Sequence, residues 1–242
     1  MSQSTSAPAP FDLPALLAAN AYPGRGLMLG RTADGRQAVV YFIMGRSENS
    51  RNRVFRRDGD ALTITRFTAD AQGDPSLILY NPVRVLGDTT IAANGDQTDT
   101  IHAALARGGS FEAALFTRTF EPDSPHFTPR ISGFTNARGY ALSILKAGNA
   151  AIGACQRQFF HYEPQNGVGH FIHTYAQDGA PLPSFAGEPA AVRVPDDIDD
   201  FTRALWESLN KDNRIALYVR FIEADGRFTD HIINRHEEGR LQ

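Results

Sequence analysis

The sequence predicts an α+β domain in which many antiparallel strands are accompanied by two groups of helices. Two observations support this fold class. Short apolar runs recur along the 242-residue chain, and turn pairs that contain Gly, Asn or Asp separate them, which is typical of antiparallel strands. Segments with helical caps and helical spacing occur over residues 98–119 and 196–210. Two sheets packed together, with helices outside, fit both observations.

The composition limits the class of protein and of partner. A hydrophobic content of 42% is enough for a sizeable core, and a formal net charge of −3 disfavours nucleic acid or an anionic membrane as partner. No apolar run approaches the ~20 residues that a membrane-spanning helix needs. A single cysteine, Cys155, excludes an internal disulfide framework and fits a reducing compartment, so we expect a cytoplasmic protein.

Residues 1–20 are expected to form a flexible leader, and residues 21–242 a single domain. The first ten residues are rich in Ser, Ala and Pro and lack the basic segment of a secretory signal. Residues 11–20 (FDLPALLAAN) are expected to add a short helix whose leucines dock on the domain.

A hairpin and a cluster of arginines open the domain. Residues 27–30 and 38–44 are expected to be strands joined through Asp34-Gly35, which would bring Arg25 beside Arg46. Polar residues 45–53 follow, with guanidinium groups at Arg46, Arg51 and Arg53 that suit phosphate or carboxylate. We interpret this stretch as an anion-binding rim for a phosphorylated small molecule; a solvated basic loop is the alternative.

A second polar loop leads into the first group of helices. After extended runs at residues 62–68, 76–80 and 83–93, residues 94–100 are expected to form a loop in which Thr98 or Asp99 caps a helix. Free backbone N–H groups at such a helix start suit a phosphate or a ligand carbonyl, although most such turns are ordinary caps. A second helix is expected over residues 110–119.

Glu121 and Asp123 follow that helix in a loop stiffened by prolines, shortly before Arg130. A carboxylate held in such a loop can act as a general acid or base if it is buried or paired with an arginine. The alternative is a glutamate that faces solvent at the end of a helix.

The C-terminal half is expected to be richer in strands. A helix that Asp196 or Asp197 caps interrupts them and ends near Asn210. His170 and His173 do not complete a metal site, because three residues along a strand place their rings on opposite faces. We therefore expect no metal site. The predicted strands cover residues 140–146, 150–155, 156–162, 168–175, 214–223 and 227–233.

Several motifs, taken in order, resemble the archaeal-type IMP cyclohydrolase family. The resemblance covers residues 22–133, and its specificity lies in the ordered set because no single motif is diagnostic. The motifs are Tyr22-Pro-Gly-Arg25, Gly45-Arg-Ser47, Asn52-Arg53, Tyr80-Asn81, Arg84 with Gly87-Asp88, Asn94-Gly-Asp-Gln-Thr-Asp-Thr100 and Thr128-Pro-Arg-Ile131.

The resemblance implies a fold, a reaction and a site. The implied fold is a four-layer αββα sandwich like that of the N-terminal nucleophile hydrolases. The implied activity is reversible ring closure of the formamido-imidazole-carboxamide ribonucleotide (FAICAR) to IMP and water, without a cofactor. The family's catalytic arginine, tyrosine and glutamate fall on Arg53, Tyr80 and Glu121. The substrate-binding residues are expected among Arg25, Arg46, Asn52, Asn81, Asn94, Gly95, Thr98, Asp99 and Arg130.

Two further functions fit the same motifs. A non-catalytic protein could bind a purine ribonucleotide as a sensor, and a paralogue could act on a related ribonucleotide. Tyr80 and Glu121 favour an enzyme, because binding alone does not need both groups. The resemblance and the exposed edges expected of open sheets also favour a homo-oligomer.

Overall fold

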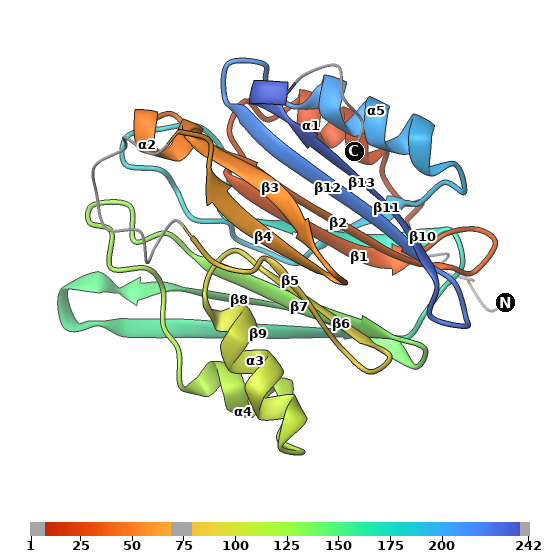
Figure 1. Ribbon diagram of the computed structural model, residues 1–242. Helices are drawn as coiled ribbons and strands as arrows, with labels where there is room; N and C mark the ends of the chain where they lie inside the picture. Colours follow the sequence, from red (N-terminus) through yellow and green to blue (C-terminus); the bar gives the residue numbers. More distant parts are fainter. Residues whose placement is uncertain (1–7, 69–78, 238–242) are drawn as a thin grey trace, which may run out of the picture.

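The computed structural model describes residues 8–68 and 79–237, and they form two sheets that face each other (Figure 1). The strands of these sheets pair antiparallel with their neighbours, which confirms the predicted α+β class. One sheet has six strands in the order β11 (Ala190–Arg193), β10 (Val168–His173), β1 (Arg25–Arg31), β2 (Gln37–Met44), β12 (Arg214–Ile222) and β13 (Phe228–Asn234). The other has seven, in the order β3 (Arg53–Asp58), β4 (Ala61–Arg66), β5 (Val83–Leu86), β6 (Thr89–Ala93), β7 (Arg130–Asn136), β8 (Gly139–Asn149) and β9 (Ala154–Tyr162).

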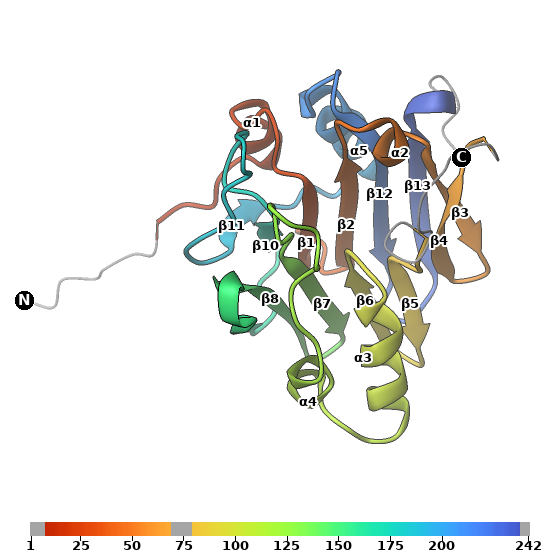
Figure 2. The same ribbon diagram turned by 90° about the vertical axis from the view of Figure 1, so that its left-hand side faces the viewer.

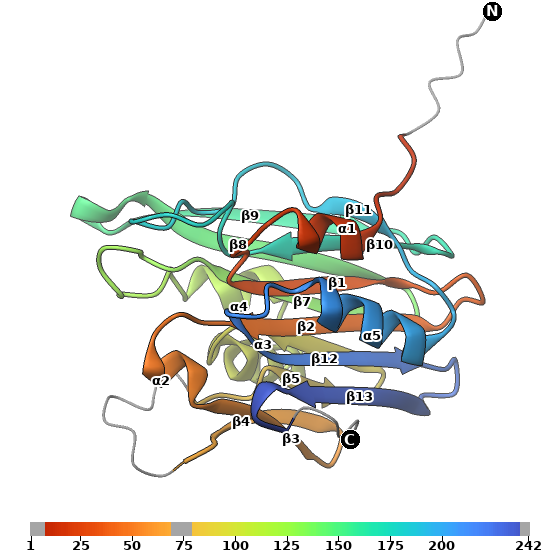
Figure 3. The same ribbon diagram turned by 90° about the horizontal axis from the view of Figure 1, so that it is seen from above.

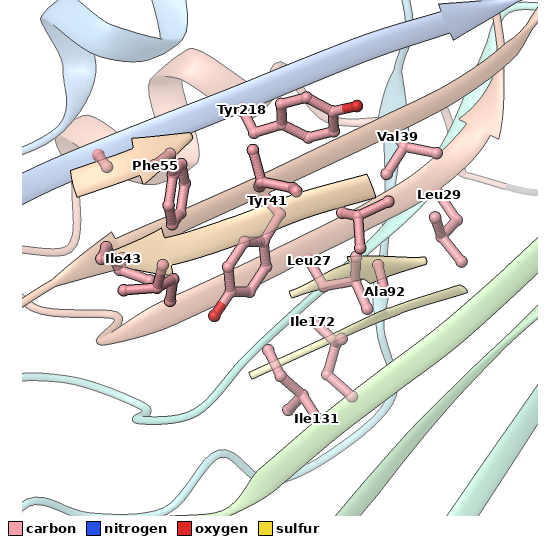
Figure 4. Close-up of a cluster of buried hydrophobic side chains, with 14 of the residues drawn as sticks. Leu27, Leu29, Val39, Tyr41, Ile43, Phe55, Ala92, Ile131, Ile172 and Tyr218 are labelled. Carbon is pink, nitrogen blue, oxygen red and sulfur yellow. The ribbon is translucent and has the colours of Figure 1, made fainter. Parts of the chain in front are cut away.

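The main hydrophobic core lies between the two sheets. Side chains such as Leu27 and Val39 from the six-stranded sheet meet Phe55 and Ile131 from the seven-stranded sheet, and all four are fully buried (Figure 4). β2 and β12 are buried on both faces, because helices cover the outer side of their sheet. These strands are therefore continuous apolar runs rather than alternating ones.

Helices cover the outer face of each sheet. α1 (Leu13–Ala18) and α5 (Ile198–Ser208) lie over the six-stranded sheet (Figure 3), where Leu17 and Leu205 join its outer core. α3 (Gln97–Ala106) and α4 (Phe111–Phe116) lie over the seven-stranded sheet (Figure 2). The described part of the chain contains no helix long and apolar enough to cross a bilayer.

The predicted short helix at the N-terminus is confirmed. Asp12 caps α1 by accepting a hydrogen bond from the Ala15 N–H, and Leu13 and Leu17 are buried. Phe11 forms a bridge with Val192 of β11, so this part of the expected leader is attached to the domain. Residues 1–7 of that leader lie outside the described residues.

Some predicted elements differ from the structure. The predicted strand over residues 150–155 is wrong, because Ala150–Ile152 form a 3-10 turn that Asn149 caps, and β9 starts only after Gly153. α3 begins at Gln97, so Thr98 and Asp99 lie in its first turn and do not cap it. Residues 76–78 of the predicted strand 76–80 lie outside the described residues, and Tyr80 belongs to no strand.

The arginine-rich stretch after β2 is not an extended loop. It contains the short helix α2 (Glu48–Arg51), in which the Ser47 hydroxyl accepts a hydrogen bond of 3.2 Å from the Ser50 N–H. Arg51 donates to the backbone oxygens of Gly45 and Asp212, which ties the helix to the six-stranded sheet. α2 therefore delivers the chain from one sheet into β3 of the other.

Candidate functional site

The candidate site lies at one end of the two sheets. Antiparallel pairing sets Arg25 of β1 opposite Ile43 near the end of β2, and Gly26 opposite His173 at the end of β10. Arg53 opens β3 directly after α2, and Glu121 precedes β7. Figure 2 views the molecule from this end, with α2 and the segment before β7 in front. The topology therefore collects residues from distant parts of the sequence.

Two arginines at this end carry buried nitrogens that find no hydrogen-bond partner in the described part of the chain. Arg53 is 1% exposed; its Nε donates to the Ser50 carbonyl at 2.8 Å, but its Nη2 has no hydrogen-bond partner among the described residues. The Nε of Arg25 is buried and equally unpartnered within the described chain. Burial and the charge of Arg25 lower the pKa of Arg53. Two like charges with unfilled donors favour an anionic or oxygen-rich ligand.

Glu121 supplies the opposite charge. Its side chain is buried, and burial raises its pKa, although Arg25 and Arg130 oppose that rise. Burial also acts to lower the pKa of Arg25, but Glu121 and the hydroxyls of Tyr175, Tyr80 and Tyr22 together outweigh it, so the pKa of Arg25 is raised. A buried carboxylate with a raised pKa is suited to accept a proton in a reaction at neutral pH.

Tyr80 joins these three side chains. Its pKa is raised by burial, against the opposing charges of Arg25 and Arg53. The Tyr80 hydroxyl lies 2.8 Å from the hydroxyl of Tyr41, which points into the core from β2. The structure thus brings Arg25, Arg53, Tyr80 and Glu121, four of the residues expected in the site, into one electrostatic cluster.

The loop that carries Glu121 is held by hydrogen bonds on both sides of it. The Glu121 N–H donates to the Thr128 carbonyl at 2.9 Å, and the Thr128 N–H donates to Asp123 Oδ1 at 2.7 Å. The Thr128 hydroxyl also donates to Asp123 and lies 2.5 Å from the hydroxyl of Tyr175. Tyr175 stacks on Tyr22, with ring centroids 5.9 Å apart. This loop is therefore fixed to the start of β1.

The turn before α3 and the first residues of α3 hold the side chain of Arg130 by hydrogen bonds. The side-chain amide of Asn94 is occupied within the domain, because it donates to the Pro129 carbonyl and accepts from the Ile131 N–H. Arg130 Nη1 donates to Asp96 and Gln97, and a side chain at Gly95 would place its Cβ 2.4 Å from that nitrogen. In the same turn, the Thr98 hydroxyl donates to the Gly95 carbonyl. These groups position Arg130 near Glu121.

The other predicted binding residues lie around this cluster or away from it. Arg46 is exposed, forms an ion pair of 2.5 Å with Asp178 and lies over the Tyr22 ring. Asn52 holds the backbone of Thr68 through both ends of its amide. Asp99 of α3 forms an ion pair with Arg84 of β5. The half-buried Asn81 makes no hydrogen bond with its side chain among the described residues.

Two tyrosines of the site were not predicted. Tyr41 stands in a strand that is apolar on both faces, so no alternation marks its side chain as part of a site. Tyr175 is the last residue of the predicted strand 168–175, and no motif marks its side chain as part of a site. A tyrosine within an otherwise aliphatic run, whose hydroxyl needs a partner when it is buried, is the one available signal.

The two histidines of β10 have separate partners. His173 Nδ1 lies 2.8 Å from the Tyr175 carbonyl, and His170 Nδ1 lies 2.7 Å from the Tyr140 hydroxyl. Burial lowers the pKa of each to about 4. In the described part of the chain, no group of three or more His, Cys, Asp or Glu side chains is placed to hold a metal ion.

Comparison with known proteins extends the family resemblance beyond residues 22–133. A model of the family described as IMP cyclohydrolase-like protein matches residues 22–227. The IMP cyclohydrolase of Methanopyrus kandleri is 30% identical over 166 residues, which cover 64% of this chain and 76% of the relative. That of Methanococcus aeolicus is 30% identical over 158 residues, with coverage of 64% and 74%. That of Methanocaldococcus jannaschii is 24% identical over 156 residues, with coverage of 64% and 73%.

Proposed function

Because the chain belongs to the family of IMP cyclohydrolase-like proteins, we propose that it catalyses the reversible ring closure of FAICAR to IMP and water. The structural observation that carries this proposal is the cluster of buried, incompletely paired groups at one end of the sheets. Arg25 and Arg53 offer unfilled donors there, next to the buried carboxyl of Glu121 and the hydroxyl of Tyr80. Buried groups that are incompletely paired destabilise the folded state, so a structural role alone does not account for this cluster.

The reaction needs a base, a proton donor and a group that stabilises charge on oxygen. The carboxamide nitrogen of the substrate attacks its formyl carbon, and Glu121 accepts the proton that the nitrogen loses. Arg53 stabilises the negative charge that develops on the formyl oxygen, and Tyr80 supplies a proton to that oxygen. The resulting hydroxyl then leaves as water with the proton that Glu121 accepted, and the formamide nitrogen gives its own proton to Tyr80 as the C=N bond of the ring forms, which restores both groups. Both reacting groups belong to one molecule, so binding it in attack geometry supplies a large part of the acceleration.

The charged residues around the cluster are assigned to the rest of the nucleotide. Arg25 and the exposed Arg46 are proposed to bind the 5′-phosphate, which would replace Asp178 as the partner of Arg46. Arg130 is proposed to contact the base or ribose from the turn that Asn94 and Gln97 support. Asn94, Gly95, Thr98 and Asn52 then act on the substrate through the backbone that they hold.

The arrangement of layers supports a finer description of the fold. We assign it to the four-layer αββα sandwich of the N-terminal nucleophile hydrolases, because helices cover the outer face of each of two facing antiparallel sheets. The proposed chemistry uses no N-terminal nucleophile and no cofactor. The single cysteine fits a reducing, cytoplasmic compartment. We also propose that the protein forms a homo-oligomer, which light scattering would test.

An ultraviolet absorbance assay of the purified protein with FAICAR tests this function. We expect IMP to form with the wild type and to form at least 100-fold more slowly, on the order of the loss of one acid–base group, in Glu121→Gln. Glu112→Gln, on α4 and outside the cluster, is the matched control and should keep wild-type activity. Saturable IMP binding in calorimetry without turnover would support the sensor instead. The absence of both turnover and binding would refute the proposal.

A further inference from the structure

Two tyrosine hydroxyls meet at the site, one from β2 and one from the segment before β5. Tyr41 lies on β2, is fully buried, and stacks on Phe55 with ring centroids 5.7 Å apart. Its hydroxyl lies 2.8 Å from that of Tyr80, and no other hydrogen bond of the Tyr41 side chain occurs among the described residues. The catalytic mechanism proposed above uses Tyr80 and gives no role to Tyr41.

The surroundings decide which hydroxyl donates. A buried hydroxyl hydrogen needs an acceptor, and the oxygen of Tyr80 is the acceptor that the described chain offers to Tyr41. If Tyr80 donated instead, the hydrogen of Tyr41 would be buried without a partner. Tyr80, in contrast, faces the charge of Glu121, so its own hydrogen has a carboxylate on the side of the site to turn toward. Tyr41 therefore donates and Tyr80 accepts.

We propose that Tyr41 is a positioning residue that directs the hydroxyl hydrogen of Tyr80 toward the substrate. By occupying one side of the Tyr80 oxygen, Tyr41 leaves the Tyr80 hydrogen to point away from β2, to the side where the charged groups lie. The charged and titratable groups that face Tyr80 are Arg25 from β1, Arg53 from β3, Tyr41 from β2 and Glu121 from the loop before β7. This inference rests on the proposed function, because it assigns how the proton donor of that reaction is oriented.

A cross-strand neighbour provides a matched control. Tyr218 of β12 stands directly opposite Tyr41 in the sheet and is also buried in the core between the sheets. Its hydroxyl points the other way (Figure 4) and donates to Asp230 at 2.9 Å. Tyr218→Phe therefore removes the same atom from the same core, and breaks a buried hydrogen bond outside the site.

The test is a double-mutant cycle on the turnover of FAICAR. We expect Tyr41→Phe to lower kcat about tenfold, the value of one net buried hydrogen bond, with KM unchanged. Tyr218→Phe should leave kcat as in the wild type. In a Tyr80→Phe background, Tyr41→Phe should lower kcat no further, because Tyr41 acts only through Tyr80. Equal, additive losses in both backgrounds would show a general packing role and overturn the inference.

A second measurement does not depend on turnover. In protein labelled with ¹³C at the tyrosine Cζ, the pH titration of Tyr80 reports its ionisation. Loss of a donated hydrogen bond disfavours the phenolate, so Tyr80 should titrate at higher pH in Tyr41→Phe than in the wild type. An unchanged titration would overturn the inference even if the enzyme is active. A shifted titration in a protein that does not convert FAICAR would refute the proposed function and keep the assigned hydrogen bond.

Discussion

Thr128 Oγ1 lies 2.5 Å from the phenolic oxygen of Tyr175 and so joins the loop that carries Glu121 to the strand that carries Arg25. The Thr128 hydroxyl donates to Asp123, so Tyr175 must be the donor to Thr128. The backbone of Tyr175 is in turn bonded to Pro23, two residues before Arg25. Thr128 thus links the loop of Glu121, the proposed base, to the backbone beside Arg25.

Thr128→Val is expected to lower both stability and turnover. It leaves the Tyr175 hydroxyl and one Asp123 oxygen without this partner, at a cost of about 1–3 kcal/mol in the free energy of unfolding. Because the Glu121 loop loses its anchor, kcat should fall as well. Thr202→Val is the control, since the buried Thr202 hydroxyl has no hydrogen-bond partner in the described chain. Urea titrations and initial rates should show no loss for that variant; equal losses in both would contradict the anchoring role.

Arg53 should be needed for activity and dispensable for stability. It is as buried as Arg220, but Arg220 forms an ion pair of 2.9 Å with Asp230, whereas Arg53 donates to a backbone carbonyl. Replacing an unpaired buried charge with a flexible apolar side chain is neutral or stabilising, while breaking a buried pair costs about 3–5 kcal/mol. Arg53→Met should therefore unfold no earlier than the wild type and lose nearly all turnover.

Arg220→Met is the matched variant, and it should unfold at clearly lower urea concentration. The comparison would fail if Arg53→Met were the less stable of the two, or if it retained wild-type turnover.

The stability of the protein should depend on pH through Glu121. Burial raises the pKa of Glu121 above its ordinary value of 4.5, so the folded chain holds this proton more tightly than the unfolded chain. The stability that the group contributes is therefore fully present below pH 4.5 and is lost as pH rises through the raised pKa. Glu121→Gln should be more stable than the wild type at pH 8, with the difference vanishing near pH 4. A constant difference across that range would contradict this.

Asn94→Ala should act on stability rather than on substrate affinity. Its amide bonds the Pro129 carbonyl, the Ile131 N–H and Gln97 inside the domain, so the loss should cost about 2–3 kcal/mol of unfolding free energy. Thermal unfolding measures this cost. A raised KM at unchanged stability would instead identify Asn94 as a direct contact to the substrate.

Local patterns in the sequence predicted some parts of the site, and long-range contacts determined others. The Asp34-Gly35 turn was enough to predict the β1–β2 hairpin and the position of Arg25. The burial of Arg53 could not be predicted in this way. β3 lies at the edge of its sheet, and Asn234 of the other sheet bonds both the N–H and the carbonyl of Phe55 across 179 residues.

β7 was missed for a different reason. Its sequence, RISGFTN, contains small and polar residues, because its partners β6 and β8 and the helices outside supply the burial. A strand whose apolar content is supplied by its neighbours has little signal of its own. Glu121 was found because the prolines around it mark a rigid loop, whereas the Tyr175 contact that anchors this loop depends on tertiary packing.

The most direct test of the account is a crystal structure of the protein with IMP. We expect a 5′-phosphate oxygen of IMP within 3.5 Å, a hydrogen-bond distance, of Arg25 Nε, and a different oxygen of the nucleotide within that distance of Arg53 Nη2, with Glu121 and Tyr80 facing the ring. A cavity of about 370 Å³ lies at the opposite end of the β1–β2 hairpin, lined by Gln37, Asp60, Arg220 and Phe228 among others. IMP bound there, with Arg53 Nη2 still unpartnered, would contradict the central claim.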